Sequence, residues 1–244
     1  VALSLMVLLS LFVYHNLINK PTLTNYIISG ILTGLVISTK YPGGVIILSF
    51  LAAHIIVTIK QKNIKYFFDK KFLISAPVVI LAFLITNPHI FFHFSEAITG
   101  ISFVSGLSNV SYYYGSPVMS GFNLSNLFSR FSNLSGIIFG IFSSMALVYS
   151  IFKKEKDYPL LIFFIFYTLY SFSSARIYTR NLIVLVPLAA ILISNLFFDL
   201  YQVTKETKFF RGIINILLAV LILSVVFISC SETIYRLRGD TRTI

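Results

Sequence analysis

The chain is poor in cysteine and in charged residues, and both shortages exclude classes of protein. Cys230 is the only cysteine, so an internal disulfide and every cysteine-based metal site are excluded. Only 11% of the residues are charged, while 57% are hydrophobic and the mean hydropathy is +0.89. A water-soluble globular domain does not have this composition, so we expect a membrane protein with several spans.

The sequence also lacks the motifs of several enzyme and transporter classes. It has no Gly-rich phosphate loop, no Ser-His-Asp set and no paired carboxylates. None of the eight acidic residues falls inside the apolar runs that we interpret as membrane spans. Because a proton-coupled transporter ordinarily keeps a carboxylate within the membrane, this absence argues against that class.

What the chain does have is a series of apolar runs of about 15 to 22 residues. An α-helix needs roughly 20 residues to cross the hydrocarbon, whereas a β-barrel would alternate with a period of two. The sequence thus predicts an all-α fold, a polytopic membrane helix bundle with about eight transmembrane helices. The predicted spans are residues 1–17, 25–39, 43–59, 72–86, 131–152, 159–175, 181–198 and 213–229. We expect residues 1–230 to form the transmembrane domain and residues 231–244 to begin an extracytoplasmic C-terminal region.

The positions of the lysines predict the topology, because short cytoplasmic loops accumulate Lys and Arg. Threading the spans alternately places Lys20 and the loops 60–71, 153–156 and 199–211 on one side, which we assign to the cytoplasm. That side holds 12 of the 19 basic residues. Lysines beside anionic lipid headgroups account for most of the net charge of +11, so the charge predicts no nucleic-acid partner.

A long segment, residues 87–130, is predicted to lie on the outer side, and it is too long for a simple connector. Within it, apolar residues recur at helical spacing between Ala97 and Leu107, which predicts a short helix along the membrane surface. Tyr112 and Tyr114 belong to a cluster of three tyrosines that follows. Such rings can stack on sugars, and they are also typical of the membrane interface.

Three cations predicted on the outer side form a candidate anion site. Lys40 lies between two apolar runs and is followed by Tyr41, Pro42 and two glycines, a break that presents an ammonium group at headgroup depth. Arg176 and Arg180 precede another apolar run, and a guanidinium matches phosphate oxygens with a planar fork of donors. This set suits the phosphate of a lipid carrier, although a snorkelling lysine and interfacial anchoring arginines would give the same pattern.

His89 and His93 have the i, i+4 spacing with which two imidazoles can bind a metal on one helical face. Glu96 is the only further ligand nearby, and interfacial hydrogen bonding is the alternative. We therefore predict no metal site in this chain, and the need for a divalent metal elsewhere in the protein stays open.

Five short stretches, taken in order along the chain, carry a family resemblance. They are residues 30–41 (GILTGLVISTKY), 87–88 (NP), 114–116 (YGS), 180–187 (RNLIVLVP) and 238–242 (RGDTR). In this order they resemble motifs of the integral-membrane glycosyltransferases of the GT-C type. The group closest in pattern contains the bacterial aminoarabinose transferase and the protein O-mannosyltransferases.

The resemblance implies a GT-C-like fold and the transfer of a sugar from a polyprenyl-phosphate donor. The acceptor would be a protein or a glycolipid at the extracytoplasmic face of the plasma membrane. The three cations would bind the lipid phosphate, and Tyr41, Tyr112 and Tyr114 would line the path of the substrate. In such chemistry a carboxylate takes the acceptor's proton while cations stabilise the leaving phosphate.

The family's catalytic aspartate lies in the first outer loop, between its first two spans. This chain begins at Val1, already inside an apolar run and without a methionine. We therefore expect that aspartate upstream of Val1, assign no catalytic residue within the chain, and expect these 244 residues alone to be inactive.

Without the family resemblance, the residues are also compatible with two other classes of function. A transporter or flippase of lipid-linked sugars would hold phosphate on the same basic face without breaking a bond. A non-catalytic membrane scaffold would use the arginines as anchors and the outer loop to bind partners. The transferase alone releases free polyprenyl phosphate, and the scaffold alone shows no saturable binding of the lipid.

Overall fold

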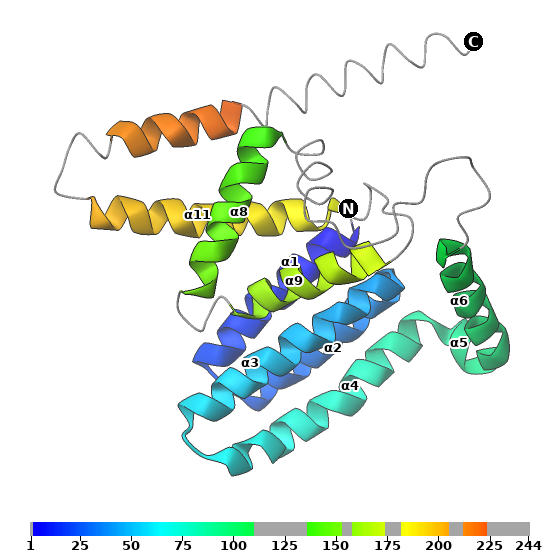
Figure 1. Ribbon diagram of the computed structural model, residues 1–244. Coiled ribbons are helices and arrows are strands. Elements are labelled where there is room, and N and C mark those ends of the chain that lie inside the picture. The colour runs from blue at the N-terminus through cyan, green and yellow to red at the C-terminus, as the bar shows by residue number, and fades with distance from the viewer. Residues whose placement is uncertain (1, 110–135, 153–157, 174–181, 205–211, 224–244) are drawn as a thin grey trace, which may run out of the picture. The chain divides into compact units, whose positions relative to one another are not determined.

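The computed structural model describes residues 2–109, 136–152, 158–173, 182–204 and 212–223. All regular secondary structure within these ranges is helical (Figure 1), as the sequence predicts. The chain divides into two compact units. The first unit comprises Val1–Phe122 and Lys153–Leu185, and the second comprises Asn123–Phe152 and Val186–Ile244.

The first unit contains seven described α-helices and two short 3-10 helices. In chain order they are α1 (Ala2–Asn19), α2 (Leu23–Thr39), η1 (Tyr41–Val45), α3 (Ile46–Lys60), η2 (Ile64–Phe68), α4 (Lys70–Thr86), α5 (Pro88–Phe92), α6 (Phe94–Asn109) and α9 (Tyr158–Ser173). Capping side chains and a proline mark where three of these helices begin. The side chains of Thr22 and Asp69 accept hydrogen bonds from the backbone at the N-termini of α2 and α4, and Pro88 opens α5.

The long helices of the first unit lie against one another in a bundle (Figure 1). α1 packs against α2 and α3, α3 packs against α9, and α2 packs along α4. In the interior, the Tyr14 ring stacks on Phe50 with 5.4 Å between centroids, and the Tyr14 hydroxyl shares a 2.6 Å hydrogen bond with that of Thr33. This bond satisfies two hydroxyls in an apolar bundle, where unpaired polar groups are costly.

Two glycines determine how α2 packs against α4. A Cβ atom on Gly30 would lie 2.9 Å from the carbonyl oxygen of Ser75, and one on Gly34 would lie 2.5 Å from that of Val79. Neither distance leaves room for a side chain, so the two backbones approach because these positions have none. The close contact brings the end of α2 beside the end of α4.

The second unit has three described helices: α8 (Ile137–Ile151), α11 (Leu185–Val203) and the helix Gly212–Leu223. Phe142 of α8 and Phe197 of α11 lie with 5.2 Å between ring centroids. Near the ends of the same helices, the Tyr149 hydroxyl donates a 2.8 Å hydrogen bond to Asp199.

Each of the eight predicted spans contains a described helix, and the predicted break after Thr39 is present as η1. Among the described residues, three helices are long and apolar enough to cross a membrane: Ala2–Asn19, Tyr41–Lys60 and Leu185–Val203. Four shorter apolar helices are Leu23–Thr39, Ile137–Ile151, Tyr158–Ser171 and Gly212–Leu223. These helices are consistent with a membrane protein, and the count of eight spans stays a prediction.

One helix extends beyond the boundary that the sequence predicts for its span. We predicted that the span beginning at residue 181 ends at residue 198, which left Asp199 outside it. α11 instead continues to Val203, so Asp199 belongs to the helix. A hydrogen-bonded carboxylate can continue an apolar helix, because Tyr149 supplies a partner for its charge. Asp199 therefore lies within a helix that is a candidate membrane span, and the predicted end of that span at residue 198 stays a prediction.

Candidate functional site

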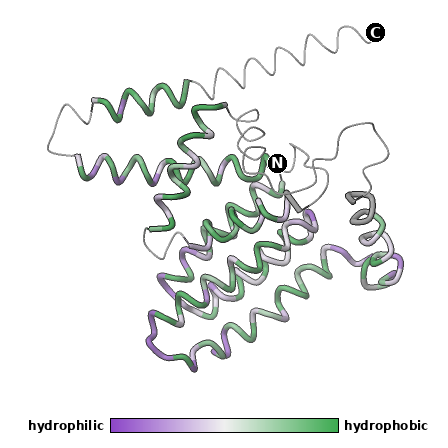
Figure 2. The backbone as a smooth tube through the Cα atoms, in the orientation of Figure 1, coloured by the Kyte–Doolittle hydropathy of each residue, from purple (hydrophilic) through white to green (hydrophobic). Residues whose placement is uncertain are grey.

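The two ends of the first unit differ in chemistry. At one end lie the turn between α1 and α2 and the segment between α3 and α4, which is hydrophilic in Figure 2. The Lys71 ammonium donates a 3.2 Å hydrogen bond to the Pro21 carbonyl, so the start of α4 is in direct contact with the turn between α1 and α2. This lysine-rich end, which includes Lys20, Lys60 and Lys62, has the composition expected of a cytoplasmic face.

The opposite end carries a cluster of neutral polar groups where α2 and α4 finish. The hydroxyls of Ser38 and Thr86 are 2.5 Å apart, and the Asn87 side-chain amide donates a 2.9 Å hydrogen bond to the Ser38 hydroxyl. These residues are 48 and 49 positions apart in sequence. The Gly30 and Gly34 contact with α4 makes the pairing possible, because it holds the two helices close along their length.

Lys40 lies two residues beyond Ser38, in extended backbone between α2 and η1. Its carbonyl accepts a 2.7 Å hydrogen bond from the Gly43 backbone, which closes the turn. A Cβ on Gly43 would lie 2.7 Å from the Val36 carbonyl oxygen, so the turn folds tightly onto α2. The side chains of Lys40 and Tyr41 are exposed at this end.

The other predicted site residues, Tyr112, Tyr114, Arg176 and Arg180, lie outside the described residues. The structure therefore joins the stretch that contains Lys40 and Tyr41 to the Asn87 motif through the hydrogen bond between Ser38 and Asn87, and it does not test the remaining four. Neither Ser38 nor Thr86 was singled out from the sequence. Hydroxyl residues near helix ends are common, and only the small residues on α2 hinted at the helix contact that pairs these two.

The polar-end cluster, which we define as Ser38, Lys40, Thr86 and Asn87, combines one cation with hydroxyl and amide groups. An ammonium group can bind a phosphate as a point charge, and the neutral groups can exchange hydrogen bonds with hydroxyls. Comparison of the chain with family models, curated proteins and solved structures finds no match. Two of the five stretches that carry the GT-C resemblance, 30–41 and 87–88, meet in this cluster.

A buried histidine near the lysine-rich end was also not picked out from the sequence. His54 Nε2 donates to the Phe67 carbonyl at 3.0 Å, and Nδ1 lies 2.7 Å from the Tyr26 hydroxyl. Because a carbonyl can only accept, the neutral ring accepts from Tyr26 at Nδ1. The ring also stacks on Phe72 with 4.0 Å between centroids. A histidine inside an apolar run was the available signal, and the structure gives it the role of joining α2, α3, η2 and α4.

Asp69 is the N-cap of α4 at the same end, and its side chain is 15% exposed. Burial alone would raise the pKa of this carboxyl. The Lys71 backbone N–H, the Tyr66 hydroxyl and the Lys71 ammonium stabilise the charged form more strongly, so the pKa lies below its ordinary value. The Asp69 carboxylate thus caps α4, and its contribution to the stability of the fold depends on its negative charge.

His89 and His93 lie with 4.6 Å between ring centroids, and His93 Nδ1 is 3.4 Å from the Glu96 carboxylate. All three side chains are exposed. No group of three metal-binding side chains is found in the part of the chain that the structure describes. The geometry corresponds to a local contact between the start of α6 and the end of α5.

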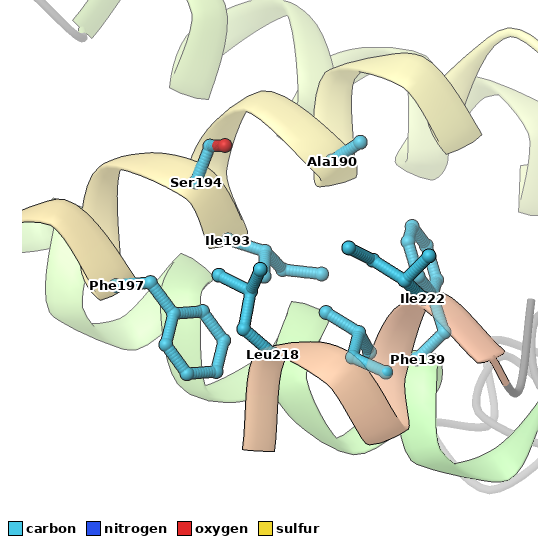
Figure 3. Close-up of a pocket in the computed structure, with 8 residues that line it drawn as sticks. Phe139, Ala190, Ile193, Ser194, Phe197, Leu218 and Ile222 are labelled. Atoms are coloured by element: carbon cyan, nitrogen blue, oxygen red, sulfur yellow. The ribbon is translucent and has the colours of Figure 1, made fainter. Parts of the chain in front are cut away.

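The second unit contains an apolar groove of about 280 Å³ between its three helices (Figure 3). It is lined by Phe139, Ala190, Ile193, Ser194, Phe197, Leu218, Leu221 and Ile222. The Ser194 hydroxyl is the single polar side-chain group among these residues. Such a lining offers no chemistry for catalysis and does not distinguish one apolar occupant from another.

Proposed function

We propose that the chain acts as part of a membrane glycosyltransferase of the GT-C type. It would move a sugar from a polyprenyl-phosphate donor to a protein or glycolipid acceptor at the extracytoplasmic face. The single observation that supports this proposal is the polar-end cluster. There, the Lys40 motif and the Asn87 motif lie together at the end opposite the lysine-rich one.

Lys40 has the role of holding the lipid phosphate. It follows directly on α2, an apolar helix, and an ammonium group at this depth meets the plane of lipid headgroups. As the sugar leaves, negative charge on the phosphate grows, and a fixed cation stabilises that charge. The base that takes the proton from the sugar-accepting substrate is a separate group, and we assign it to no residue of the chain.

Arg176 and Arg180 are proposed to share the phosphate with Lys40. In the first unit, α9 ends at Ser173, and the sequence continues from there to Arg176. α9 also packs against η1, the turn that follows Lys40. Tyr41, Tyr112 and Tyr114 would line the path of the sugar by stacking on its ring.

The test is a transfer assay in membranes that contain the gene product. Lys40→Ala should lower kcat/KM for the polyprenyl-phosphate sugar by about 10- to 100-fold, since a hydrogen bond to a charged group contributes about 1.5–3 kcal/mol. Lys20→Ala, at the lysine-rich end of the same unit, is the matched control and should keep its activity. Unchanged turnover by Lys40→Ala at limiting donor would contradict the phosphate role.

A lipid-linked sugar flippase is the second candidate, and one observation favours it. Asp199 lies within α11, a candidate membrane span, and a carboxylate in a span is typical of proton-coupled transport. The same assay separates the two functions. A transferase releases free polyprenyl phosphate, while a flippase moves the intact lipid between leaflets and releases none. A scaffold would do neither.

A further inference from the structure

Asn87 has a side chain whose orientation is fixed by its neighbours. Its amide nitrogen donates to the Ser38 hydroxyl at 2.9 Å and to the Phe83 carbonyl at 3.0 Å, with the Thr86 hydroxyl at 3.3 Å. A carboxamide has two N–H donors, so these contacts occupy both. Because the Phe83 oxygen can only accept, the nitrogen and the oxygen of this amide cannot exchange places without loss of a hydrogen bond.

The carbonyl oxygen of the same amide, Oδ1, is left as an acceptor. No described residue donates a hydrogen bond to it, although it has two lone pairs. The Asn87 backbone N–H bonds to the carbonyls of Phe83 and Leu84 at the end of α4. The Asn87 side-chain oxygen is therefore not needed to cap this helix. The side chain is half-buried at the end of the unit, so Oδ1 is a rigid acceptor at the edge of the cluster.

Asn87 and Lys40 lie at the same end of the first unit, because Asn87 bonds to Ser38 and Ser38 is two residues from Lys40. Ser38, which holds the amide, lies in the last turn of α2, two residues before Lys40, and two such positions of a helix lie about 5–6 Å apart. A phosphate bound at Lys40 would therefore place the ring of an attached sugar near Asn87. Sugars present hydroxyl groups, which donate to carbonyl oxygens, whereas the bare phosphate headgroup presents acceptors to the same site.

We propose that Asn87 Oδ1 accepts a hydrogen bond from a sugar hydroxyl of the lipid-linked donor and so distinguishes the glycosylated lipid from bare polyprenyl phosphate. This inference rests on the proposed function, in which Lys40 binds the phosphate. Asn87 is a specificity residue in this scheme, and Ser38 is a positioning residue that acts through it.

The experiment measures binding to the gene product in lipid nanodiscs. The probes are one polyprenyl phosphate and its mannosyl, glucosyl and aminoarabinosyl derivatives with the same chain length. The wild type should bind at least one derivative more tightly than the bare lipid. Asn87→Ala should reduce that preference about three- to tenfold, the effect of one neutral hydrogen bond, and leave affinity for the bare lipid unchanged. Asn19→Ala removes an exposed amide at the other end of the unit and should change neither affinity.

Ser38→Ala provides a second variant in case Asn87→Ala does not fold. It keeps the Asn87 carbonyl but frees the amide to turn, so it should give a smaller loss of the same preference. The inference is overturned if Asn87→Ala keeps the wild-type preference, if it weakens bare and glycosylated lipids equally, or if the wild type has no preference. A wild type that binds none of the lipids would instead overturn the proposed function, and the inference with it.

Discussion

Polar side chains gather at both ends of the first unit, in addition to those buried in its interior. At the lysine-rich end, polar side chains bond mainly to one another and to the backbone, as Asp69 does with Lys71 and Tyr66. At the polar-end cluster, Lys40 is exposed and the Asn87 carbonyl has a fixed direction. The first pattern stabilises turns, and we propose that the second binds a ligand.

Asp69 predicts a pH dependence of stability. Its pKa in the folded chain lies below the ordinary 3.8, so its carboxylate contributes stability that is fully present above about pH 4. That contribution is lost as the pH falls through the lowered folded pKa. Asp69→Asn keeps a capping side chain but cannot titrate, so its unfolding temperature in detergent should change less than that of the wild type between pH 5 and about pH 2. Parallel pH profiles for the two proteins would contradict this.

At the residue scale, the sequence predicted a site at Lys40 and Tyr41 because they stand at a break in an apolar run, and it marked Asn87 only as part of a stretch that resembles a family motif. It could not identify Ser38 and Thr86, whose partners are almost 50 residues away. It also overlooked His54, because a lone histidine in a helix shows its role only once its hydrogen-bond partners are known. Long-range pairing is set by packing, and a single sequence does not reveal which faces meet.

Among the elements, the pair of α2 and α4 is the one that builds the cluster. Gly34→Ala should destabilise the protein by about 1–3 kcal/mol, because its new Cβ would lie 2.5 Å from the Val79 carbonyl oxygen and 2.7 Å from Ala82 Cβ. Gly100→Ala in α6 is the matched control, since nothing lies within 4 Å of its Cβ. Chemical denaturation in detergent measures both. If Gly34→Ala were instead more stable, as the helix propensity of alanine alone would make it, α2 and α4 would not be in close contact at this position.

α6 is predicted to lie along the membrane surface. It starts soon after the end of α4, and Ile98 and Phe103 on it are 50% and 65% exposed. Ile98 and Glu96 are two residues apart, which places them on nearly opposite faces of a helix. Spin labels at Ile98→Cys and Glu96→Cys, each in a Cys230→Ser background, should differ in nanodiscs. We expect the first to be protected from a water-soluble nickel relaxer and the second to be accessible, and equal accessibility would contradict the surface position.

Helix positions were largely predictable from the sequence, whereas helix ends were not. The apolar runs located all eight helices that correspond to predicted spans, and helical spacing located α6. The end of α11 was placed too early because a carboxylate in a sequence suggests an end of a span. The Tyr149 hydroxyl, 50 residues away in sequence, donates a hydrogen bond to Asp199 within the helix, and the sequence gives no sign of this contact.

For the whole molecule, the central claim is that one end of the first unit binds a lipid phosphate and the lysine-rich end does not. Both ends carry ammonium groups, so net charge alone does not decide between them. The lysine-rich end has more charge, while the polar-end cluster combines Lys40 with a fixed neutral acceptor, the Asn87 side-chain oxygen.

The most direct test is photo-crosslinking with a polyprenyl phosphate that carries a diazirine on the isoprene unit next to the phosphate. The gene product in nanodiscs is irradiated with this lipid, and the labelled residues are mapped by mass spectrometry. We predict labels at residues 38–41 and 83–87, which Lys40→Ala should greatly reduce and Lys20→Ala should not. Labels concentrated at residues 60–71, or a pattern that Lys40→Ala leaves unchanged, would contradict the account.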